Sequence, residues 1–515
     1  MTDKVFRFSE LGRENIGNRV KDAAVCFGHF NTIHPGHIRY FRTARAYSTP
    51  LVVVLEGDSQ LSAAEQGRFF PEEDRAQSLA TLDLVDTVVI LDKGTLEDFI
   101  DQADFFALVL GKEFEEARAG KVKGAVAAAS EKGAKVFFDA GETHYAGSEL
   151  LYGSPGELEN KRWQEFVKAQ NAQDVALEDI FPLITSSKPS NMLVIGDTIV
   201  DRYVACDPIG MSNEAPVVVV KEMETRDYIG GAAIVAAHVA ALGARCAYLS
   251  VTGPDNEASF VADSLHEYGV ETVLLTDHSR PTTFKIRYMV ESQKLFRVSR
   301  LNEHSISADL EESLDAEIIN RAPLLDGILV SDFVYGVITP KIIKTLLKVK
   351  RDYGIQLYGD LQCSSQVGSV LKFRDFSLIC PTEREARIAL GNQDDGIEYV
   401  ANLLLEKTRS ANIVLKLGRD GFISYRGEKA AEGFVQRQHF PALTANPLDV
   451  AGAGDALLAA MATGLSRGLS LMQASALASC VAAIAVQTVG NRPISLGHVQ
   501  NFFSQHLDNG LNNVV

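Results

Sequence analysis

Residues 448–462 of this chain read Leu-Asp-Val-Ala-Gly-Ala-Gly-Asp-Ala-Leu-Leu-Ala-Ala-Met-Ala. Gly452 and Gly454 flank Ala453, and glycines let the backbone turn tightly and leave its amides uncovered. The apolar run after Asp455 predicts a buried helix that begins at this turn. Such amides bind phosphate oxygens, and Asp455 stands where it can take a proton from an attacking hydroxyl. The stretch predicts a phosphoryl-transfer site; a glycine-rich turn that only caps a core helix is the alternative.

The run from Asp449 to Asp455 resembles the D-T-x-G-A-G-D signature of the ribokinase-type sugar kinases, with Val450 in place of the usual threonine. The resemblance extends over residues 189–515. It implies a doubly wound parallel sheet with a small β lid over the sugar, ATP as phosphoryl donor and Mg²⁺ as the metal. In that family the last Asp of the motif is the general base, and the G-A-G turn before it binds phosphate.

Composition restricts the classes of partner. A chain of 515 residues is long enough for two or three domains, and its 46% hydrophobic and 23% charged residues are ordinary for a globular protein. The net charge of -17 argues against general affinity for nucleic acid or an anionic membrane. Six scattered cysteines without a C-x-x-C pair, and an N-terminus without an apolar signal core, lead us to expect a cytoplasmic protein without disulfides or zinc.

Five apolar runs predict the strands of an N-terminal domain over residues 1–152. The runs are residues 23–30, 51–55, 88–91, 107–111 and 135–138. They alternate with segments of helical spacing, which is typical of a doubly wound parallel α/β sheet. Open sheets of this kind bind ligands at the carboxyl ends of their strands. We therefore expect a five-stranded Rossmann-like domain with a ligand site at that edge.

Two histidines, His34 and His37, follow the first of these strands at the head of a predicted helix. Imidazoles three residues apart on a helix point the same way, so both can bond one phosphate as charge builds up at phosphorus. Surface polarity is the alternative for an isolated pair. The run from Phe27 to His37 resembles the H-x-G-H signature of the cytidylyltransferase-like nucleotidyltransferases. The resemblance implies that both histidines are catalytic and that Phe27 and Gly28 bind nucleotide.

Other parts of this resemblance are looser. It implies that Arg75 and Lys112 neutralise nucleotide phosphates and that Ser148 caps the last helix and touches a phosphate. Two departures affect the local polarity. Residues 29–31 read His-Phe-Asn where the family has Asp after Phe, and the second nucleotide motif is reduced to residues 147–151. Nucleotidyl transfer is the expected activity, with the base left open.

Residues 153–188 predict a helical connector between domains, because turn residues lie at both ends of a charged helical run. The only tryptophan, Trp163, is expected to pack against a domain face.

The resemblance to the sugar kinases assigns further residues of the second domain. Asp197 and Asp201 follow its first strand, and the acid at position 201 is implied to bind sugar hydroxyls. The run from Ser212 to Val220 predicts a strand of the lid. The other implied substrate contacts are Gly230, Gly231 and Arg297.

Nucleotide and metal contacts are implied later in the chain. Gly418 and Gly421 form a G-x-x-G turn beside the expected nucleotide site, and Glu385 is the acid implied to place Mg²⁺, partly through water. Strands over residues 328–332, 356–360, 378–381 and 413–416 complete the second doubly wound sheet.

Both domains together resemble the bifunctional heptose 7-phosphate kinase and heptose 1-phosphate adenylyltransferase enzymes of lipopolysaccharide precursor synthesis, with the order of the two domains reversed. Four positions depart from the kinase pattern. Ile234 replaces a sugar-binding Asn, Tyr335 and Gln362 replace lysines, and Thr382 replaces the Asn of N-x-x-E. An apolar residue cannot bond a hydroxyl, so these departures predict either a different sugar or a weaker kinase.

The sequence thus predicts a two-headed enzyme. One domain phosphorylates a sugar or sugar phosphate with Mg-ATP, and the other joins a sugar 1-phosphate to a nucleotide and releases pyrophosphate. Sugar phosphate and nucleoside triphosphate are the expected partners, without nucleic acid or membrane, and a homo-oligomer is expected. Two alternatives stay open: a single catalytic domain with a sensing or assembly module, and a scaffold without enzymatic activity.

Overall fold

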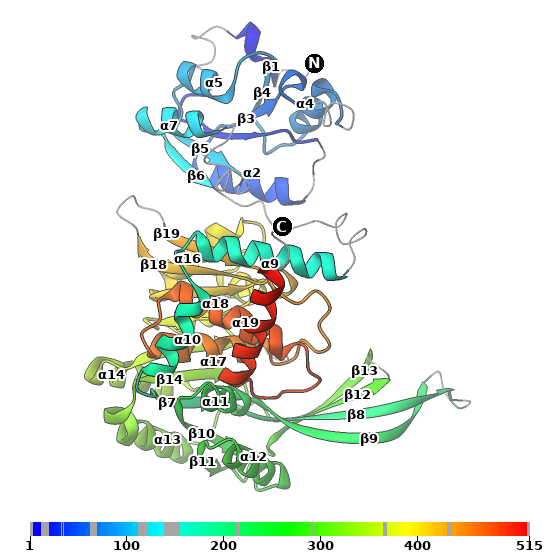
Figure 1. Cartoon of the computed structure of the whole chain (residues 1–515), viewed down its shortest axis with the longest axis vertical. Helices are drawn as coiled ribbons and strands as arrows, with labels where there is room; N and C mark the ends of the chain where they lie inside the picture. The colour runs from blue at the N-terminus through cyan, green and yellow to red at the C-terminus, as the bar shows by residue number, and fades with distance from the viewer. Residues whose placement is uncertain are drawn as a thin grey trace. The chain divides into compact units, whose positions relative to one another are not determined.

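The computed structural model describes residues 4–11, 20–31, 33, 35–61, 69–111, 122–138, 155–212, 214, 217–290, 293–363, 368–429 and 435–511. Contacts divide the chain into two units, Met1–Leu151 with Asn392–Val400, and Tyr152–Gly391 with Ala401–Val515. Each unit has an α/β fold built on a mainly parallel sheet (Figure 1), so the predicted fold class is confirmed.

The described part of the first unit contains a six-stranded sheet, one strand more than the sequence predicts. Its strands are β1 Val5–Arg7, β2 Ala24–Gly28, β3 Leu51–Glu56, β4 Thr87–Leu91, β5 Ala107–Leu110 and β6 Lys135–Phe138. All pairings are parallel, in the order β1-β4-β3-β2-β5-β6. The five predicted strands are confirmed. The sixth, β1, has three half-buried residues and therefore no apolar run that would reveal it.

Successive residues of β2 enter different layers of the core. Val25 and Phe27 belong to one apolar cluster, whereas Ala24 and Cys26 belong to the other. Burial of both faces explains why these strands read as continuous apolar runs. The described helices of the unit are α2 Pro35–Tyr47, α4 Glu72–Ala80, α5 Leu96–Gln102 and α7 Lys123–Glu131.

The strand order of the first unit fixes the position of its ligand edge. The chain runs from β2 through β3 to β4, then returns to the opposite side of β2 as β5. Strands β2 and β5 therefore flank the point where the winding direction reverses, and open α/β sheets bind ligands there. The loop from Gly28 to α2, which carries the histidine motif, begins at this point.

The second unit is built on a nine-stranded sheet. Its strands are β7 Asn191–Gly196, β10 Arg245–Thr252, β11 Glu271–Thr276, β14 Gly327–Asp332, β15 Gln356–Leu361, β16 Leu378–Ile379, β17 Asn412–Lys416, β18 Phe422–Lys429 and β19 Val435–Phe440. Their order is β11-β10-β7-β14-β15-β16-β17-β18-β19, and all pairings are parallel except β17 with β18 and β18 with β19, which are antiparallel. The winding reverses between β7 and β14. The ligand edge is thus where β7, β14, β15 and β17 end.

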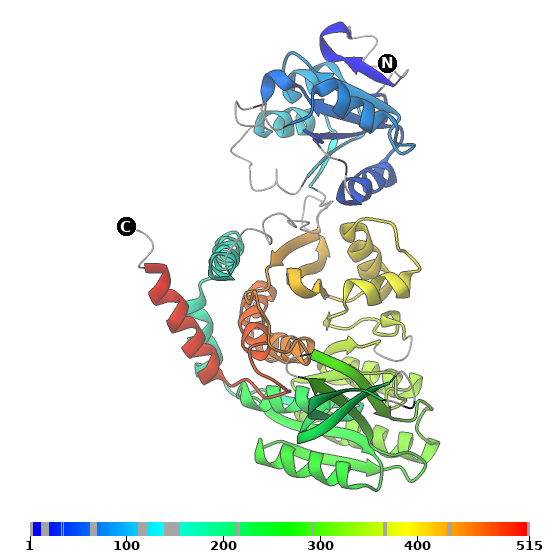
Figure 2. The same cartoon turned by 90° about the vertical axis from the view of Figure 1, so that its right-hand side faces the viewer.

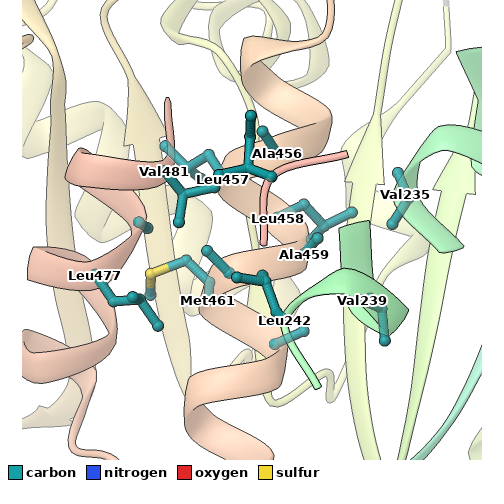
Figure 3. Packing of buried hydrophobic residues seen from close by; sticks show 14 of the residues in the cluster. Val235, Val239, Leu242, Ala456, Leu457, Leu458, Ala459, Met461, Leu477 and Val481 are labelled. Carbon is teal, nitrogen blue, oxygen red and sulfur yellow. The ribbon is translucent and has the colours of Figure 1, made fainter. Parts of the chain in front are cut away.

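Helices cover both faces of this sheet. They are α11 Ala232–Ala241, α12 Asn256–Glu267, α13 Ala308–Arg321, α14 Pro340–Tyr353, α15 Glu383–Leu390, α16 Ile397–Thr408, α17 Ala453–Ser466 and α18 Leu471–Ala485. Figure 3 shows how α17 lies between α11 and α18: Leu458 and Ala459 lie toward Val235 of α11, while Met461 lies beside Leu477 of α18. Small residues let these helices approach closely, so the beginning of α17 is held firmly at the ligand edge.

A separate four-stranded sheet forms the lid. Its strands are β8 Thr198–Met211, β9 Val218–Gly231, β12 Thr283–Val290 and β13 Gln293–Arg300, in the order β13-β12-β8-β9. The lid leaves the body of the unit beside α11 and α12 in Figure 1 and faces the viewer in Figure 2. The strand predicted over residues 212–220 is confirmed from Val218 on, where β9 begins. Ser212 donates its N–H to the Val217 carbonyl just before this strand, and residues 213, 215 and 216 lie outside the described residues.

The segment predicted as a connector is part of the second unit. It forms α9 Pro155–Asn171 and α10 Leu177–Ser186, and Phe166, Ile180 and Ile184 are buried in the core of that unit. Trp163 packs on the same core, with its ring 6.2 Å from that of Phe502 in α19 Leu496–Leu511. Apolar packing, rather than linker flexibility, therefore determines the position of these helices.

Across the described ranges, the structure contains no helix that is both long and apolar enough to cross a bilayer.

Candidate active site

The first turn of α17 forms an uncapped helix N-terminus at the ligand edge of the second unit. Gly452 precedes it in the left-handed conformation, with φ of 80°, and no side chain caps the helix. A Cβ at position 452 would lie 2.4 Å from Oδ1 of Asn491, so space as well as backbone conformation requires glycine there. Residues Ala451 to Gly454 are partly exposed. The N–H of Ala451 donates to Asp449 at 3.1 Å, and that of Ala453 makes only a long bond of 3.5 Å to the Val450 carbonyl, so the amides from Ala453 onward can turn to an anion.

Asp455 is buried in this first turn and has one neutral donor. Nε2 of Gln362 donates to its Oδ1 at 2.8 Å. Burial, and after it the Asp360 carboxylate, raises the pKa of Asp455 to about 7, although Lys416 and Gln362 oppose the shift. A carboxylate with a pKa near neutrality matches the requirement for a general base.

An ion pair lies beside Asp455. Nζ of Lys416, at the end of β17, donates to both oxygens of Asp360, at the end of β15, at 2.8 and 2.7 Å. Burial raises the pKa of Asp360 to about 6, which Lys416 only partly offsets. Burial alone would lower the pKa of Lys416, but Asp360 and then Glu385 outweigh it, so this pKa is raised.

A second carboxylate lies at the root of the lid. Asp201 is paired with Arg287 of β12 at 2.5 Å and accepts from Nδ2 of Asn491 at 3.2 Å. A Cβ at Gly230 would come within 2.5 Å of Oδ2 of Asp201. The missing side chain at position 230 therefore allows this carboxylate to lie against the backbone of β9.

Asp449 connects the lid to the glycine turn. Its Oδ2 accepts from the hydroxyl of Tyr203 at 2.7 Å, and its Oδ1 accepts from Nζ of Lys294 at 3.2 Å and from the N–H of Ala451 at 3.1 Å. Burial would raise the pKa of Asp449, but these donors hold it below the usual value. Strands β8 and β13 of the lid are thus bonded to the segment that precedes α17.

Asp197 fixes the backbone of residues 333–337, which follow β14. Its Oδ2 accepts from the backbone N–H of Phe333 at 2.7 Å and of Tyr335 at 3.3 Å, and its Oδ1 accepts from that of Val337 at 3.4 Å. Burial raises the pKa of Asp197 despite these donors. The sequence assigned Asp197 to the substrate. The structure gives it a structural task, and a sugar contact stays a prediction.

Glu385 closes a helix cap. Thr382 caps α15 by accepting from the N–H of Glu385, whose Oε2 accepts from the N–H of Thr382 at 2.8 Å, and whose Oε1 accepts from the N–H of Cys363 at 3.0 Å. No cluster of three or more His, Cys, Asp or Glu side chains among the described residues could hold a metal ion. Mg²⁺ is usually bound by one or two carboxylates together with substrate phosphates, so the contact of Glu385 with this ion stays a prediction.

The other predicted residues of this unit lie in three places: a turn after β17, the lid and the apolar core. Gly418 and Gly421 both have positive φ and bound a single 3₁₀ turn after β17. Arg297 is exposed on β13 opposite Arg287, which is the lid arginine that bonds Asp201. Ile234 is completely buried in the apolar core.

In the first unit, the loop after β2 is folded around Phe30. This residue is buried with φ of 43°, and a Cβ at Gly28 would lie 3.1 Å from its ring. His37 lies in the first turn of α2, with its ring 5.1 Å from that of Phe30. A non-glycine residue in the left-handed region is strained, and such strain concentrates at functional loops. Phe27 is the penultimate residue of β2.

Arg75 has a structural role in the first unit. Its side chain is completely buried, and it donates to the carbonyls of Phe70, His29 and Glu56 and to Oδ1 of Asp58. Because its guanidinium ties together the segments that follow β2 and β3, a nucleotide contact would require these bonds to break. The predicted phosphate contact is not supported by this arrangement. His34, Lys112 and Ser148 lie outside the described residues.

Four site residues escape prediction from sequence: Asp360, Lys416, Arg287 and Asn491. They belong to three separate strands and to a loop after α18, and only the fold brings them together. Gln362, which directly follows β15, was identified only as the replacement of a lysine. One signal was available for Glu385, because Thr-x-x-Glu before an apolar run is the pattern of a capping box.

Comparisons with known proteins agree with this geometry. The pfkB family carbohydrate kinase profile matches residues 190–496, and the cytidylyltransferase-like profile matches residues 25–135. The Bifunctional protein HldE of Wolinella succinogenes is 28% identical over 324 residues, 62% of this chain and 66% of that protein. The Bifunctional protein HldE of Geotalea uraniireducens is 31% identical over 329 residues, 62% of this chain and 64% of that protein. The chain thus spans less than two thirds of the length of these relatives.

Among solved structures, phosphofructokinase-2 from Escherichia coli in complex with substrates and products is similar with a TM-score of 0.51. The match covers 62% of this chain and 99% of that one at 15% identity. At this identity it supports the fold of the second unit and nothing finer.

Proposed function

This chain belongs to the pfkB family of carbohydrate kinases, and we propose that its second unit transfers the γ-phosphoryl group of Mg-ATP to a hydroxyl of a sugar or sugar phosphate. The observation that carries the proposal is Asp455, a buried carboxylate in the uncapped first turn of α17 whose pKa burial raises to about 7. Helix amides and a base with this pKa are what the reaction needs in one place.

The proposed step is a direct transfer from ATP to the acceptor. The acceptor hydroxyl oxygen forms a bond to the γ-phosphorus as the bond from that phosphorus to the β-phosphate oxygen breaks, and ADP leaves with the electron pair. The hydroxyl proton passes to Asp455, which Gln362 holds in place through its 2.8 Å hydrogen bond. The amides of Ala453 and Gly454 stabilise the charge on the transferred group. Asp201 and Arg287 bind the acceptor under the lid.

For the first unit we propose nucleotidyl transfer to a sugar 1-phosphate, with release of pyrophosphate. Support comes from the cytidylyltransferase-like match over residues 25–135 and from the histidine loop, which begins where the winding of the sheet reverses. His37 would bond the triphosphate, together with His34 and Lys112. The name of the relatives, Bifunctional protein HldE, fits two activities in one chain, and we propose heptose phosphates as the first substrates to test.

Two assays on the whole chain test the proposal. ADP formation is measured with heptose 7-phosphate and Mg-ATP, and pyrophosphate release is measured with heptose 1-phosphate and either ATP or CTP. Activity in both assays supports a two-headed enzyme. Activity in only one assay across a panel of sugar phosphates would favour the alternative, in which the other unit senses a ligand or aids assembly.

A further inference from the structure

Lys416 occupies an unusual place for a buried lysine. Its side chain is 11% exposed at the carboxyl end of β17, and Asp360, its partner on β15, is completely buried. The strand between them, β16, has only two residues and ends at Ile379. Because β16 stops early, the lysine can cross its end and reach the ligand edge.

The amine of Lys416 lies under the first turn of α17. A Cβ at Gly454 would lie 3.3 Å from Nζ of Lys416 and 4.0 Å from Oδ2 of Asp360. A cation is unfavourable at a helix N-terminus, where the helix dipole is positive. Two positive groups meet at this point, and Asp360 is the carboxylate bonded to the lysine, with Asp455 in the first turn itself and Glu385 as further nearby carboxylates.

Asp360 is a poor permanent partner for this lysine. Burial and the nearby Glu385 carboxylate both disfavour its charge, and Lys416 compensates only in part, so its pKa is raised to about 6. The carboxylate of Asp455 is close enough for Asp360 to raise its pKa as well. A phosphate oxygen at the partly exposed turn could accept from Nζ without crowding these carboxylates further.

We propose that Lys416 is a phosphate-binding residue of the kinase site, and that Asp360 holds its ammonium until the nucleotide arrives. On binding, Nζ turns from Asp360 to an oxygen of the transferred phosphoryl group, beside the amides of Ala453 and Gly454. This inference rests on the proposed kinase function and adds a residue to its catalytic machinery. The alternative is a pair that only stabilises the fold, as buried Lys–Asp pairs can.

Substitutions of each partner in turn distinguish a phosphate-binding lysine from a pair that only stabilises the fold. Lys416→Met removes the cation and should weaken binding of ATP, measured by calorimetry with excess Mg²⁺, by about ten-fold or more, because hydrogen bonds to charged groups are the strong ones. Asp360→Asn frees the cation without removing it and should tighten ATP binding. Lys416→Arg should retain most of the affinity. If the pair is purely structural, Lys416→Met and Asp360→Asn should both weaken ATP binding, each in proportion to its loss of thermal stability.

A matched control is available one strand away. Lys372 is a partly buried lysine, paired with the buried Asp332 at the end of β14. Lys372→Met should lower the melting temperature but leave ATP affinity within about two-fold of the wild type. If Lys416→Met fails to fold, Asp360→Asn alone decides, because weakened ATP binding in a folded Asp360→Asn protein overturns the inference.

Failure of the inference and failure of the kinase function have different signatures. If the wild type forms ADP and Lys416→Met binds ATP and turns over like the wild type, the inference is wrong and the kinase function stands. If the wild type neither binds ATP nor forms ADP with heptose 7-phosphate, both the inference about Lys416 and the proposed kinase function are wrong.

Discussion

Replacement of Asp455 by Asn removes the proposed general base and preserves the size of the side chain. The Asn carbonyl can still accept from Gln362, and the amides of Ala453 and Gly454 are unchanged, so ATP should still bind. General-base contributions are about 10² to 10⁴-fold, so ADP formation should fall by at least about 10²-fold. Because the pKa of Asp455 is raised to about 7 by burial and then by Asp360, wild-type kcat should rise with pH through about 7. The kcat of the Asp455→Asn variant should not show this rise with pH.

The same substitution should stabilise the protein. The folded-state pKa of Asp455 is raised from 3.8 to about 7, first by burial, so its contribution to stability is present below pH 3.8 and is lost as pH rises through about 7. A rise of about three pKa units corresponds to a cost of about 4 kcal/mol at pH 8. Asn does not ionise and avoids this cost. The variant should therefore melt above the wild type at pH 8, and the difference should shrink toward pH 4.

The assay couples ADP formation to a spectroscopic readout at saturating sugar phosphate and Mg-ATP, from pH 5.5 to 8.5, with melting curves and pyrophosphate release on the same preparations. Asp263→Asn on an exposed part of α12 is the control, and it should change neither rate nor stability. Pyrophosphate release should persist in both variants. ADP formation by Asp455→Asn within a few-fold of the wild type would refute the general-base assignment, and unchanged stability at pH 8 would refute the raised pKa.

Three further outcomes are expected. His37→Ala should abolish pyrophosphate release and leave ADP formation intact, because the units have separate sheets; equal loss of both activities in a folded protein would contradict separate sites. Gln362→Lys should lower the pKa of Asp455 by about one unit or more, because a cation favours the ionised form. The rate of ADP formation should then remain high at lower pH. An unchanged pH dependence of this rate would mean that position 362 does not set the pKa of Asp455. Ile234→Asn should lower stability by about 2 kcal/mol or more, because it buries an amide among apolar side chains; an unchanged melting temperature would show that the amide finds partners at this position.

The sequence predicts the sheets well because their strands are buried on both faces. Val52 and Val53, for instance, enter opposite core layers, and such strands appear as apolar runs whatever their neighbours. The lid is harder to predict. Strands β8 and β9 are each 14 residues long and mostly exposed in their distal halves, so neither apolar runs nor strict alternation mark them.

The site is predictable where one local stretch contains the chemistry. Asp455 and the glycine turn lie within four residues, and the structure places them together at the head of α17. The pair of Lys416 and Asp360 joins the ends of strands 56 residues apart, and no local pattern predicts it. Arg75 is the opposite case: this charged residue of a motif-like stretch is bonded to backbone carbonyls, which no local pattern shows, and its phosphate contact stays a prediction.

One measurement tests the central claim most directly: phosphorus NMR of a single mixture of the wild-type chain, Mg-ATP and heptose 7-phosphate. If the first turn of α17 and Asp455 transfer a phosphoryl group to a hydroxyl, the γ-phosphate signal of ATP should be replaced by a new sugar phosphate signal in equal amount to ADP. A sugar 1-phosphate should give pyrophosphate with ATP or CTP in the matching mixture. ATP that stays intact across a panel of sugar phosphates, or that yields only inorganic phosphate, would contradict the claim.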